Sequence, residues 1–378
     1  MGRALISGID TLDVGLSVGE YKLSSVELSA LLHAKEEAQQ AGDCRDKADN
    51  LIRLHGFEFE VLPGGTPRHE FILKNDDLTV KICPSANSGE KYPEIMVHFS
   101  SACLWREGVE GAWKQVSEWI NNWACVSENK VSRVDLCCDV ESPLPKLSHD
   151  FREVVSRADK RKQYLSGDFS IERHISGLRE SGFSFGSNPM ICRIYDKTLE
   201  IEKKSHKEWF YDLWREAGWQ SGLVTRTEFQ IRRKALKVRG INTVEQLIER
   251  QADLWQYLTE QWITLVVPKS SDSNRSRWNT KPFWKLVQGG ASLFGSFRQC
   301  IKRVAQVLPR IDTLEKQALG VMASIGAAYR SVKEFKDCDY YGKPEFLVNR
   351  MTNWLYDRKF EDKVQKRTVK FASLAVGN

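Results

Sequence analysis

Apolar and polar residues alternate along several short segments in the first 240 residues of the chain. Such alternation has a period of two and predicts strands with one buried face. The segments that show it are residues 11–16, 57–62, 70–82 and 93–102. Asn75, Asp76 and Asp77 interrupt the third of them with turn-forming residues, which predicts a hairpin. Because hairpins join antiparallel strands, we expect a largely antiparallel sheet.

Helical spacing of apolar residues appears between these strands and dominates the rest of the chain. In the first part it covers residues 23–40, 110–123, 148–158 and 206–217. After residue 240 the helical periods become longer, at residues 243–266 and 311–335. The pattern predicts an α+β fold, with a largely antiparallel sheet and flanking helices in residues 1–240 and a mainly helical region in residues 241–378.

The length and composition agree with two globular domains. The chain has 378 residues, more than the roughly 250 to 300 at which a single core stops growing. Its apolar stretches are shorter than the ~20 residues that cross a bilayer, and its start lacks the pattern of a secretory signal. The nine cysteines show no paired CxxC spacing. We therefore expect a cytoplasmic protein with free thiols, no membrane contact and no structural zinc.

Charge is unevenly distributed along the chain. The formal net charge is +6, while residues 241–378 hold 22 basic and 14 acidic residues. An acidic part that can hold a divalent cation, joined to a basic part that can lie along phosphates, suits a nucleic-acid enzyme. Solvated helix faces explain the charge equally well, so the charge permits the hypothesis without supporting it alone.

Three strand-like segments carry one apolar and one ionic face, since successive side chains on a strand point to opposite sides. They are residues 133–140, 191–200 and 225–233. Strand periodicity places these side chains on their ionic faces: Arg133, Asp135, Cys137 and Asp139; Arg193, Tyr195 and Lys197; Arg226, Glu228, Gln230 and Arg232. A polar outer face of a half-buried sheet is the plain interpretation of any one strand. Three such strands with carboxylates, arginines and a tyrosine favour a functional surface.

The residue types on this face match the chemistry of phosphodiester cleavage. Carboxylate oxygens, here from Asp135, Asp139 and Glu228, are the ligands that Mg²⁺ or Mn²⁺ prefers. Arginines bind phosphate oxygens in a bidentate manner. Residues 186–189 supply a turn before the tyrosine strand, so that Tyr195 is expected in the middle of a hairpin. A rigid hairpin suits a nucleophile that must be held in line with its target.

These segments resemble the Rep_trans replication initiation factors, which are tyrosine nickases of plasmids and phages with relatives among conjugative-element relaxases. The matching pieces, in order, are IDTLDVGL from residue 9, VHFSSAC from 97, RVDLCCD from 133, FGS from 185, RIYDKTLE from 193 and RTEFQIR from 226. The resemblance covers most of residues 8–240. It implies that Tyr195 is the nucleophile and that Asp135 or Asp139, together with Glu228, holds the metal.

The resemblance further implies a replication initiator that nicks one strand of origin DNA. Attack by Tyr195 would yield a 5′-phosphotyrosine and a free 3′-hydroxyl for rolling-circle replication, with Arg193 and Lys197 stabilising the phenolate and the transition state. A host helicase and polymerase are the expected partners, and a homodimer is left open. A conjugative relaxase would use the same chemistry. The alternatives from other classes are a non-catalytic DNA-binding protein and a metal-dependent nuclease that activates water.

Basic residues outside the ionic face are expected to hold the DNA. Residues 268–282 form a polar, serine-rich segment between prolines, which predicts an exposed loop. In this loop Arg275, Arg277 and Lys281 would meet phosphates and Trp278 would stack on an unpaired base. Arg133, Arg226 and Arg232 are the expected phosphate contacts on the strands. A flexible loop with incidental charge is the alternative.

Overall fold

The structure is a computed structural model that describes residues 2–41, 50–85, 92–156, 171–176, 179–269 and 271–294. The chain divides into two compact units, Met1–Lys302 and Arg303–Asn378. All described residues lie in the first unit. The helix predicted at residues 311–335 lies outside the described residues.

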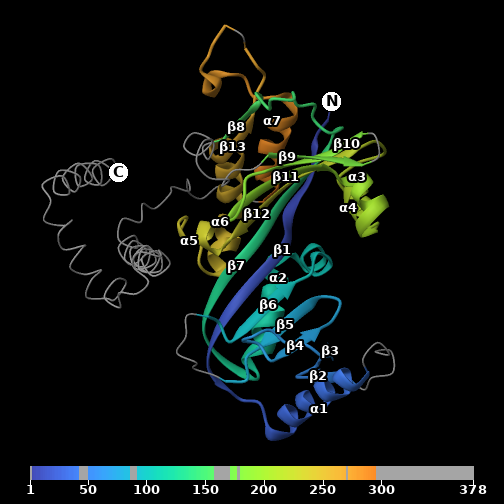
Figure 1. The fold of residues 1–378 in the computed structure, drawn as a ribbon, viewed down its shortest axis with the longest axis vertical. Helices are drawn as coiled ribbons and strands as arrows, with labels where there is room; N and C mark the ends of the chain where they lie inside the picture. Colours follow the sequence, from blue (N-terminus) through green and yellow to red (C-terminus); the bar gives the residue numbers. More distant parts are fainter. Residues whose placement is uncertain are drawn as a thin grey trace, which may run out of the picture. The chain divides into compact units, whose positions relative to one another are not determined.

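An antiparallel sheet of eleven strands organises the described part of the chain (Figure 1). Its two central strands, β1 and β7, are each 18 residues long and pair along nearly their whole length. The strands of the sheet are β1 (Ala4–Tyr21), β2 (Leu51–Leu54), β3 (Phe57–Val61), β4 (Phe71–Lys74), β5 (Leu78–Ile82), β6 (Ile95–Phe99), β7 (Ala124–Glu141), β9 (Ile171–Ser176), β10 (Arg179–Phe185), β11 (Met190–Asp196) and β12 (Val224–Arg232).

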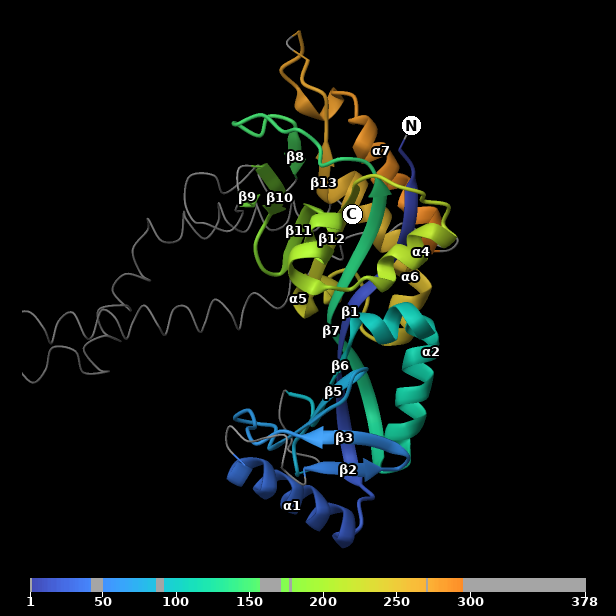
Figure 2. The ribbon, with the colours of Figure 1, turned by 90° about the vertical axis from the view of Figure 1, so that its right-hand side faces the viewer.

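The shorter strands attach to opposite ends of the long pair. Strands β6, β5, β4, β3 and β2 continue the sheet from β1, and strands β12, β11, β10 and β9 continue it from β7. Figure 2 shows the two groups at different levels along β1 and β7. The predicted hairpin around residues 75–77 joins β4 and β5. The α+β class and the antiparallel sheet are therefore confirmed.

Helices and short helical turns cover parts of both faces of the sheet. The α-helices are α1 (Ser25–Ala41), α2 (Ser101–Asn121), α3 (Lys197–Glu200), α4 (Trp209–Glu216), α5 (Arg233–Lys237), α6 (Val244–Gln256) and α7 (Pro282–Gly289). Two π-helical turns, η2 (Ile201–Ser205) and η3 (Tyr257–Trp262), and two 3-10 turns, η4 (Arg275–Arg277) and η5 (Gly290–Phe294), extend or connect them.

Two predicted helices differ from the structure. The prediction at residues 148–158 is wrong for the described part, because Val154–Ser156 forms strand β8 and pairs with β13 (Ile263–Leu265). The long prediction at residues 243–266 ends in that same β13. Local apolar spacing cannot distinguish a strand that is fixed by a partner about 110 residues away in the chain. The other predicted helices correspond to α1, α2 and α4.

The apolar face of β7 packs on the helices after residue 240. Val134, Leu136 and Val140 of β7 belong to the same core as Trp255 of α6 and Trp284 of α7. The first helices of the region that we predicted as a second domain thus complete the core beneath the sheet. The proposed division of function between residues 1–240 and 241–378 stays a prediction. No helix in the described ranges is long and apolar enough to cross a membrane.

Candidate active site

The ionic faces of the three predicted strands form one surface, because β7, β12 and β11 are neighbours in the sheet. In this register Arg226 lies opposite both Asp139 and Tyr195, and Glu228 lies opposite both Cys137 and Arg193. Directly opposed residues project to the same side of a sheet. The structure therefore brings together Asp135, Asp139, Arg193, Tyr195, Arg226 and Glu228, as the alternation predicted.

Tyr195 and Arg193 converge on Glu228. The Tyr195 hydroxyl donates a hydrogen bond to Glu228 Oε2 at 3.0 Å, and Arg193 Nη1 donates to Oε1 at 3.1 Å. Arg193 Nη2 also donates to Gln230 Oε1 at 3.0 Å. Burial raises the pKa of Tyr195 well above its ordinary value; the negative charge of Glu228 adds to this effect and Arg226 opposes it. At rest the phenol is therefore neutral and held in one direction by a carboxylate.

Lys197 reaches the site from a helix. Strand β11 ends at Asp196, whose side chain caps α3, and Lys197 is the first residue of that helix. Its Nζ donates to Glu200 Oε2 at 2.5 Å and lies 5.9 Å from the centre of the Tyr195 ring. Burial and then Arg226 lower the pKa of Lys197, while Glu200 raises it. Lys197 thus lies beside the ring, and its predicted catalytic role stays a prediction.

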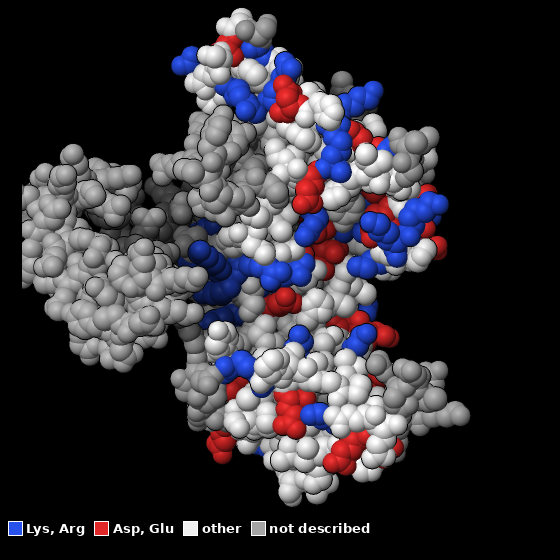
Figure 3. All heavy atoms as spheres, viewed as in Figure 1, with Lys and Arg blue, Asp and Glu red and all other residues white. Residues whose placement is uncertain are grey.

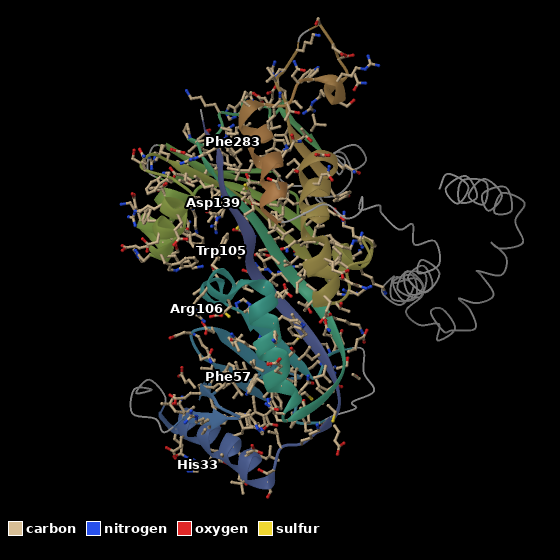
Figure 4. All side chains as sticks on the ribbon, turned by 180° about the vertical axis from the view of Figure 1, so that it is seen from behind. His33, Phe57, Trp105, Arg106, Asp139 and Phe283 are labelled. Carbon is tan, nitrogen blue, oxygen red and sulfur yellow. The ribbon has the colours of Figure 1, made fainter. Side chains whose placement is uncertain are left out.

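Asp139 and Arg226 form an ion pair that is sealed inside the protein. Arg226 Nε donates to Asp139 Oδ1 at 2.6 Å and Arg226 Nη2 donates to Oδ2 at 2.8 Å, with both side chains 0% exposed. Trp214 of α4 donates from Nε1 to Asp139 Oδ2 at 2.9 Å, and the Phe210 ring lies 4.3 Å from the guanidinium. Figure 4 labels Asp139 among the strands.

This burial corrects two expectations from the sequence. Arg226 is not available for the phosphate contact that we predicted, and Asp139 has both oxygens engaged by nitrogen donors instead of facing a metal. Alternation placed both residues on the right face, but it does not reveal that α4 covers this end of it. The pair is a buried support under the tyrosine strand.

Asp10 completes the support and was missed by the sequence analysis. It accepts hydrogen bonds from Arg226 Nη1 at 2.9 Å, Ser101 Oγ at 2.9 Å and Trp105 Nε1 at 3.1 Å. Burial raises the pKa of Asp10, but the charges of Arg226, Lys207 and Lys197 outweigh it and hold that pKa at about 2. Asp10 sits where the register of β1 on β7 shifts, so simple alternation gives no signal for it.

Asp135 is paired with Arg133 of its own strand. Arg133 Nε donates to Asp135 Oδ1 at 2.8 Å and Arg133 Nη2 donates to Oδ2 at 2.5 Å. Burial raises the pKa of Asp135 to about 6; Glu228 adds to the rise and Arg133 opposes it. The carboxylate of Glu228 therefore lies near enough to Asp135 to raise the pKa of Asp135.

The donor set fits a divalent ion in part. Among the described residues no group of three or more His, Cys, Asp or Glu side chains is arranged to hold a metal. Mg²⁺ commonly takes only one or two carboxylates and fills its other positions with water and phosphate. Glu228 lines the groove, whereas Asp135 is 2% exposed and has both oxygens engaged by Arg133, so Asp135 would bind an ion only after Arg133 moved away. Arg133 is partly exposed and could move, whereas the partner of Asp139 is fully buried.

A groove of about 980 Å³ lies over Tyr195 and Glu228. Its lining includes Arg133 and Arg193 from the strands and Lys203 and Lys204 from η2. Figure 3 shows a band of Lys and Arg that runs from α5 across the middle strands of the same molecule. Arg232, at the end of β12, is exposed and lies opposite Arg133. The groove is therefore polar, and its Lys and Arg side chains, which alternate with the carboxylates of Glu172, Asp196, Glu200 and Glu228, can meet a phosphate backbone.

The predicted DNA-binding loop lies outside this groove. Arg275 donates to the main-chain oxygen of Arg152, Trp278 Nε1 donates to that of Asp272 at 2.7 Å, and Lys281 Nζ donates to that of Lys146 at 2.8 Å. Arg277 is exposed. None of the four predicted loop residues lines the groove. Their contact with DNA stays a prediction.

Comparison with solved structures shows a structural likeness. No family model matches the chain, and no curated protein matches it. Among solved structures it is similar to a rolling circle replication initiator protein from Geobacillus stearothermophilus, with 16% identity and a TM-score of 0.44, over 81% of this chain and 100% of that chain. A likeness at this level carries no argument about function, so the functional argument rests on the side chains of this chain.

Proposed function

We propose that this chain is a DNA-nicking enzyme that attacks a phosphodiester with Tyr195, in the role of a replication initiator. The observation that carries the proposal is the Tyr195 hydroxyl, which is fixed on Glu228 at 3.0 Å in a groove lined by both cations and carboxylates. A tyrosine on a sheet face without function would need no partly buried carboxylate partner. A carboxylate acceptor and flanking arginines are what a tyrosine nucleophile for phosphate requires.

The neutral phenol of Tyr195 is a weak nucleophile, and neighbouring side chains can increase its reactivity. For an ordinary tyrosine with a pKa of about 10, ionisation at neutral pH costs roughly 4 kcal/mol of free energy. Burial increases this cost for Tyr195. Glu228 accepts the phenol hydrogen bond and can take its proton as the oxygen attacks. Arg193 lies beside Glu228 and is placed to stabilise the negative charge that develops on the phosphate.

The products would be a 5′-phosphotyrosine at Tyr195 and a free 3′-hydroxyl that a polymerase can extend. A divalent ion held by Asp135 and Glu228 would neutralise charge on the scissile phosphate and orient it. Arg133 and Arg193 would bind the flanking backbone from the groove wall. The same chemistry serves a conjugative relaxase, so initiator and relaxase differ in the DNA that they receive.

Covalent capture tests the proposal directly. The protein is incubated with a pool of random-sequence single-stranded oligonucleotides and Mg²⁺ or Mn²⁺, and protein that carries DNA through denaturation is isolated and its DNA sequenced. We expect an adduct on Tyr195 in the wild type and none in Tyr195→Phe, with oligonucleotide binding little changed, since one hydroxyl is lost. Tyr21→Phe, on β1, removes a hydroxyl that donates to the main-chain oxygen of Cys83 and serves as the matched control.

The outcomes separate the rival functions. Cleavage without an adduct would assign the site to a water-activating nuclease. Binding with neither cleavage nor adduct would leave a DNA-binding protein whose ionic face is structural. An adduct that persists in Tyr195→Phe would move the nucleophile to another tyrosine.

A further inference from the structure

Three residues lie in one row across the floor of the groove. On β10, Gly182 is directly opposite Tyr195 of β11 on one side and His174 of β9 on the other. All three line the groove. Because residues in one row project to the same side, the phenol and the imidazole face the same space with only a glycine between them.

The missing side chain of Gly182 leaves that space open. A Cβ atom at this position would lie 2.8 Å from the Tyr195 Cβ and 2.8 Å from the Ile194 main-chain oxygen, so the strand accepts only glycine here without displacement. Neighbouring strands are about 4.8 Å apart, which separates the backbones at Tyr195 and His174 by roughly 10 Å. A phosphodiester fits between two side chains that approach it from that distance.

His174 is held at the far side of this space by a neighbour. Its Nε2 is 2.7 Å from Ser184 Oγ, and Ser184 lies on β10 opposite Arg193. His174 is exposed to the groove. The charged side chains that line the same groove are Arg133, Glu172, Arg173, Arg193, Asp196, Glu200, Lys203, Lys204 and Glu228. An exposed imidazole with a hydroxyl partner is equipped to exchange a proton with a bound substrate.

We propose that His174 is the general acid of the nicking reaction, an inference that rests on the function proposed above. In-line displacement at phosphorus places the attacking and the leaving oxygen on opposite sides. The bond from Tyr195 Oη to phosphorus forms and the phosphorus–O3′ bond breaks. The phenol proton passes to Glu228, and a proton from the protonated His174 ring passes to the departing O3′. In resealing, His174 takes the proton back from the 3′-hydroxyl.

A sulfur-substituted leaving group tests this role. The DNA sequence recovered by covalent capture is synthesised in two forms, one with the natural 3′ oxygen and one with a 3′ bridging sulfur at the scissile bond. A thiolate leaves without a proton because a thiol, with a pKa of about 8.5, is far more acidic than an alcohol. Single-turnover cleavage of both substrates is measured for wild type, His174→Ala, His174→Gln and the exposed His33→Ala control on α1 (Figure 4).

We expect His174→Ala and His174→Gln to slow cleavage of the oxygen substrate on the order of 100-fold. Cleavage of the sulfur substrate should fall by less than about 3-fold, because it needs no acid. His33→Ala should match the wild type on both. An equal loss on both substrates would overturn the proposal, since it would indicate a structural role for His174, and so would full activity of both variants on the oxygen substrate.

Failure of the nicking function and failure of the role of His174 give different results. If covalent capture recovers no adduct from the wild type, the nicking function itself fails. If the wild type forms the adduct and the His174 variants lose nothing, only the assignment of the acid fails. His174→Gln retains a hydrogen-bonding group toward Ser184, so it keeps the test informative if the alanine variant does not fold.

Discussion

Tyr195 and Glu228 lie on neighbouring strands, and the tyrosine hydroxyl donates to the glutamate Oε2 at 3.0 Å. The residue directly opposite Tyr195 is Arg226, so the contact with Glu228 is diagonal across β11 and β12. Arg226 turns away into its buried pair with Asp139, which leaves the glutamate as the partner of the phenol. This relationship makes Glu228 the group on which the reactivity of Tyr195 depends.

Glu228→Gln should therefore reduce adduct formation on the order of 100-fold or more, because an amide cannot accept the phenol proton. The variant should remain folded, since glutamine fills the same space. The measurement is single-turnover adduct formation, with the exposed Glu58→Gln on β3 as the control. Wild-type rates in Glu228→Gln would contradict the assignment of Glu228 as the proton acceptor.

Asp135 and Asp139 should respond differently to loss of charge. Asp135→Asn should raise the Mg²⁺ concentration needed for half-maximal nicking by about 10- to 100-fold, because it removes a candidate ligand. Asp139→Asn should leave that concentration unchanged and lower stability, because its carboxylate is engaged by Arg226 and Trp214. Magnesium titrations of nicking measure both variants. Full nicking by the wild type in excess chelator would rule out the metal site.

Arg226 should be a stability residue. Arg226→Ala leaves the carboxylates of Asp139 and Asp10 without their shared cation in a buried site, at a cost of about 3–5 kcal/mol. The exposed Arg232→Ala on the same strand is the matched control and should change stability by less than about 0.5 kcal/mol. Urea unfolding measures both. Equal stability of the two variants would show that the ion pair is not a structural support.

The lowered pKa of Asp10 predicts that the stability of the protein depends on pH. The pKa of this carboxyl in the folded protein is about 2, below the ordinary 3.8, so its contribution is complete above pH 4 and is lost as the pH falls through 2. The difference corresponds to about 2 kcal/mol. Asp10→Asn should be less stable than the wild type by about that amount at pH 7, and the gap should shrink below pH 4. If the difference in stability between the wild type and Asp10→Asn stays constant between pH 7 and pH 3, the lowered pKa of Asp10 is not the source of that stability.

Helix α5 should contact the DNA backbone beside the groove. The chain has no acidic residue between Glu228 and Glu245, and Lys234 and Lys237 are exposed next to Arg232. In the double variant Lys234→Ala/Lys237→Ala, the slope of log affinity for duplex DNA against log salt concentration should be shallower by about 2. The reason is that each phosphate contact contributes about 0.9 to this slope. The exposed pair Lys22→Ala/Lys114→Ala is the control. An unchanged slope in the α5 variant would place the DNA elsewhere.

The sequence by itself determined the strands of the site and the side on which their charged residues lie. Period-two alternation is a local property, so Asp135, Glu228 and Tyr195 could be assigned to one face before their strands were known to be neighbours. The turn before β11 and the hairpin at residues 75–77 were equally local. The sequence did not distinguish an accessible charge from a buried one.

The tertiary structure decided burial, pairing and the residues that complete the site. Arg226 and Asp139 are sealed because α4, from a separate part of the chain, lies over them. Asp10 joins them at a register shift that alternation does not describe, and Lys197 arrives from a helix after the strand has ended. His174 faces Tyr195 only because β9 and β11 pair with opposite edges of β10. These contacts are set by long-range packing, and residues far apart in the chain carry no local signal of it.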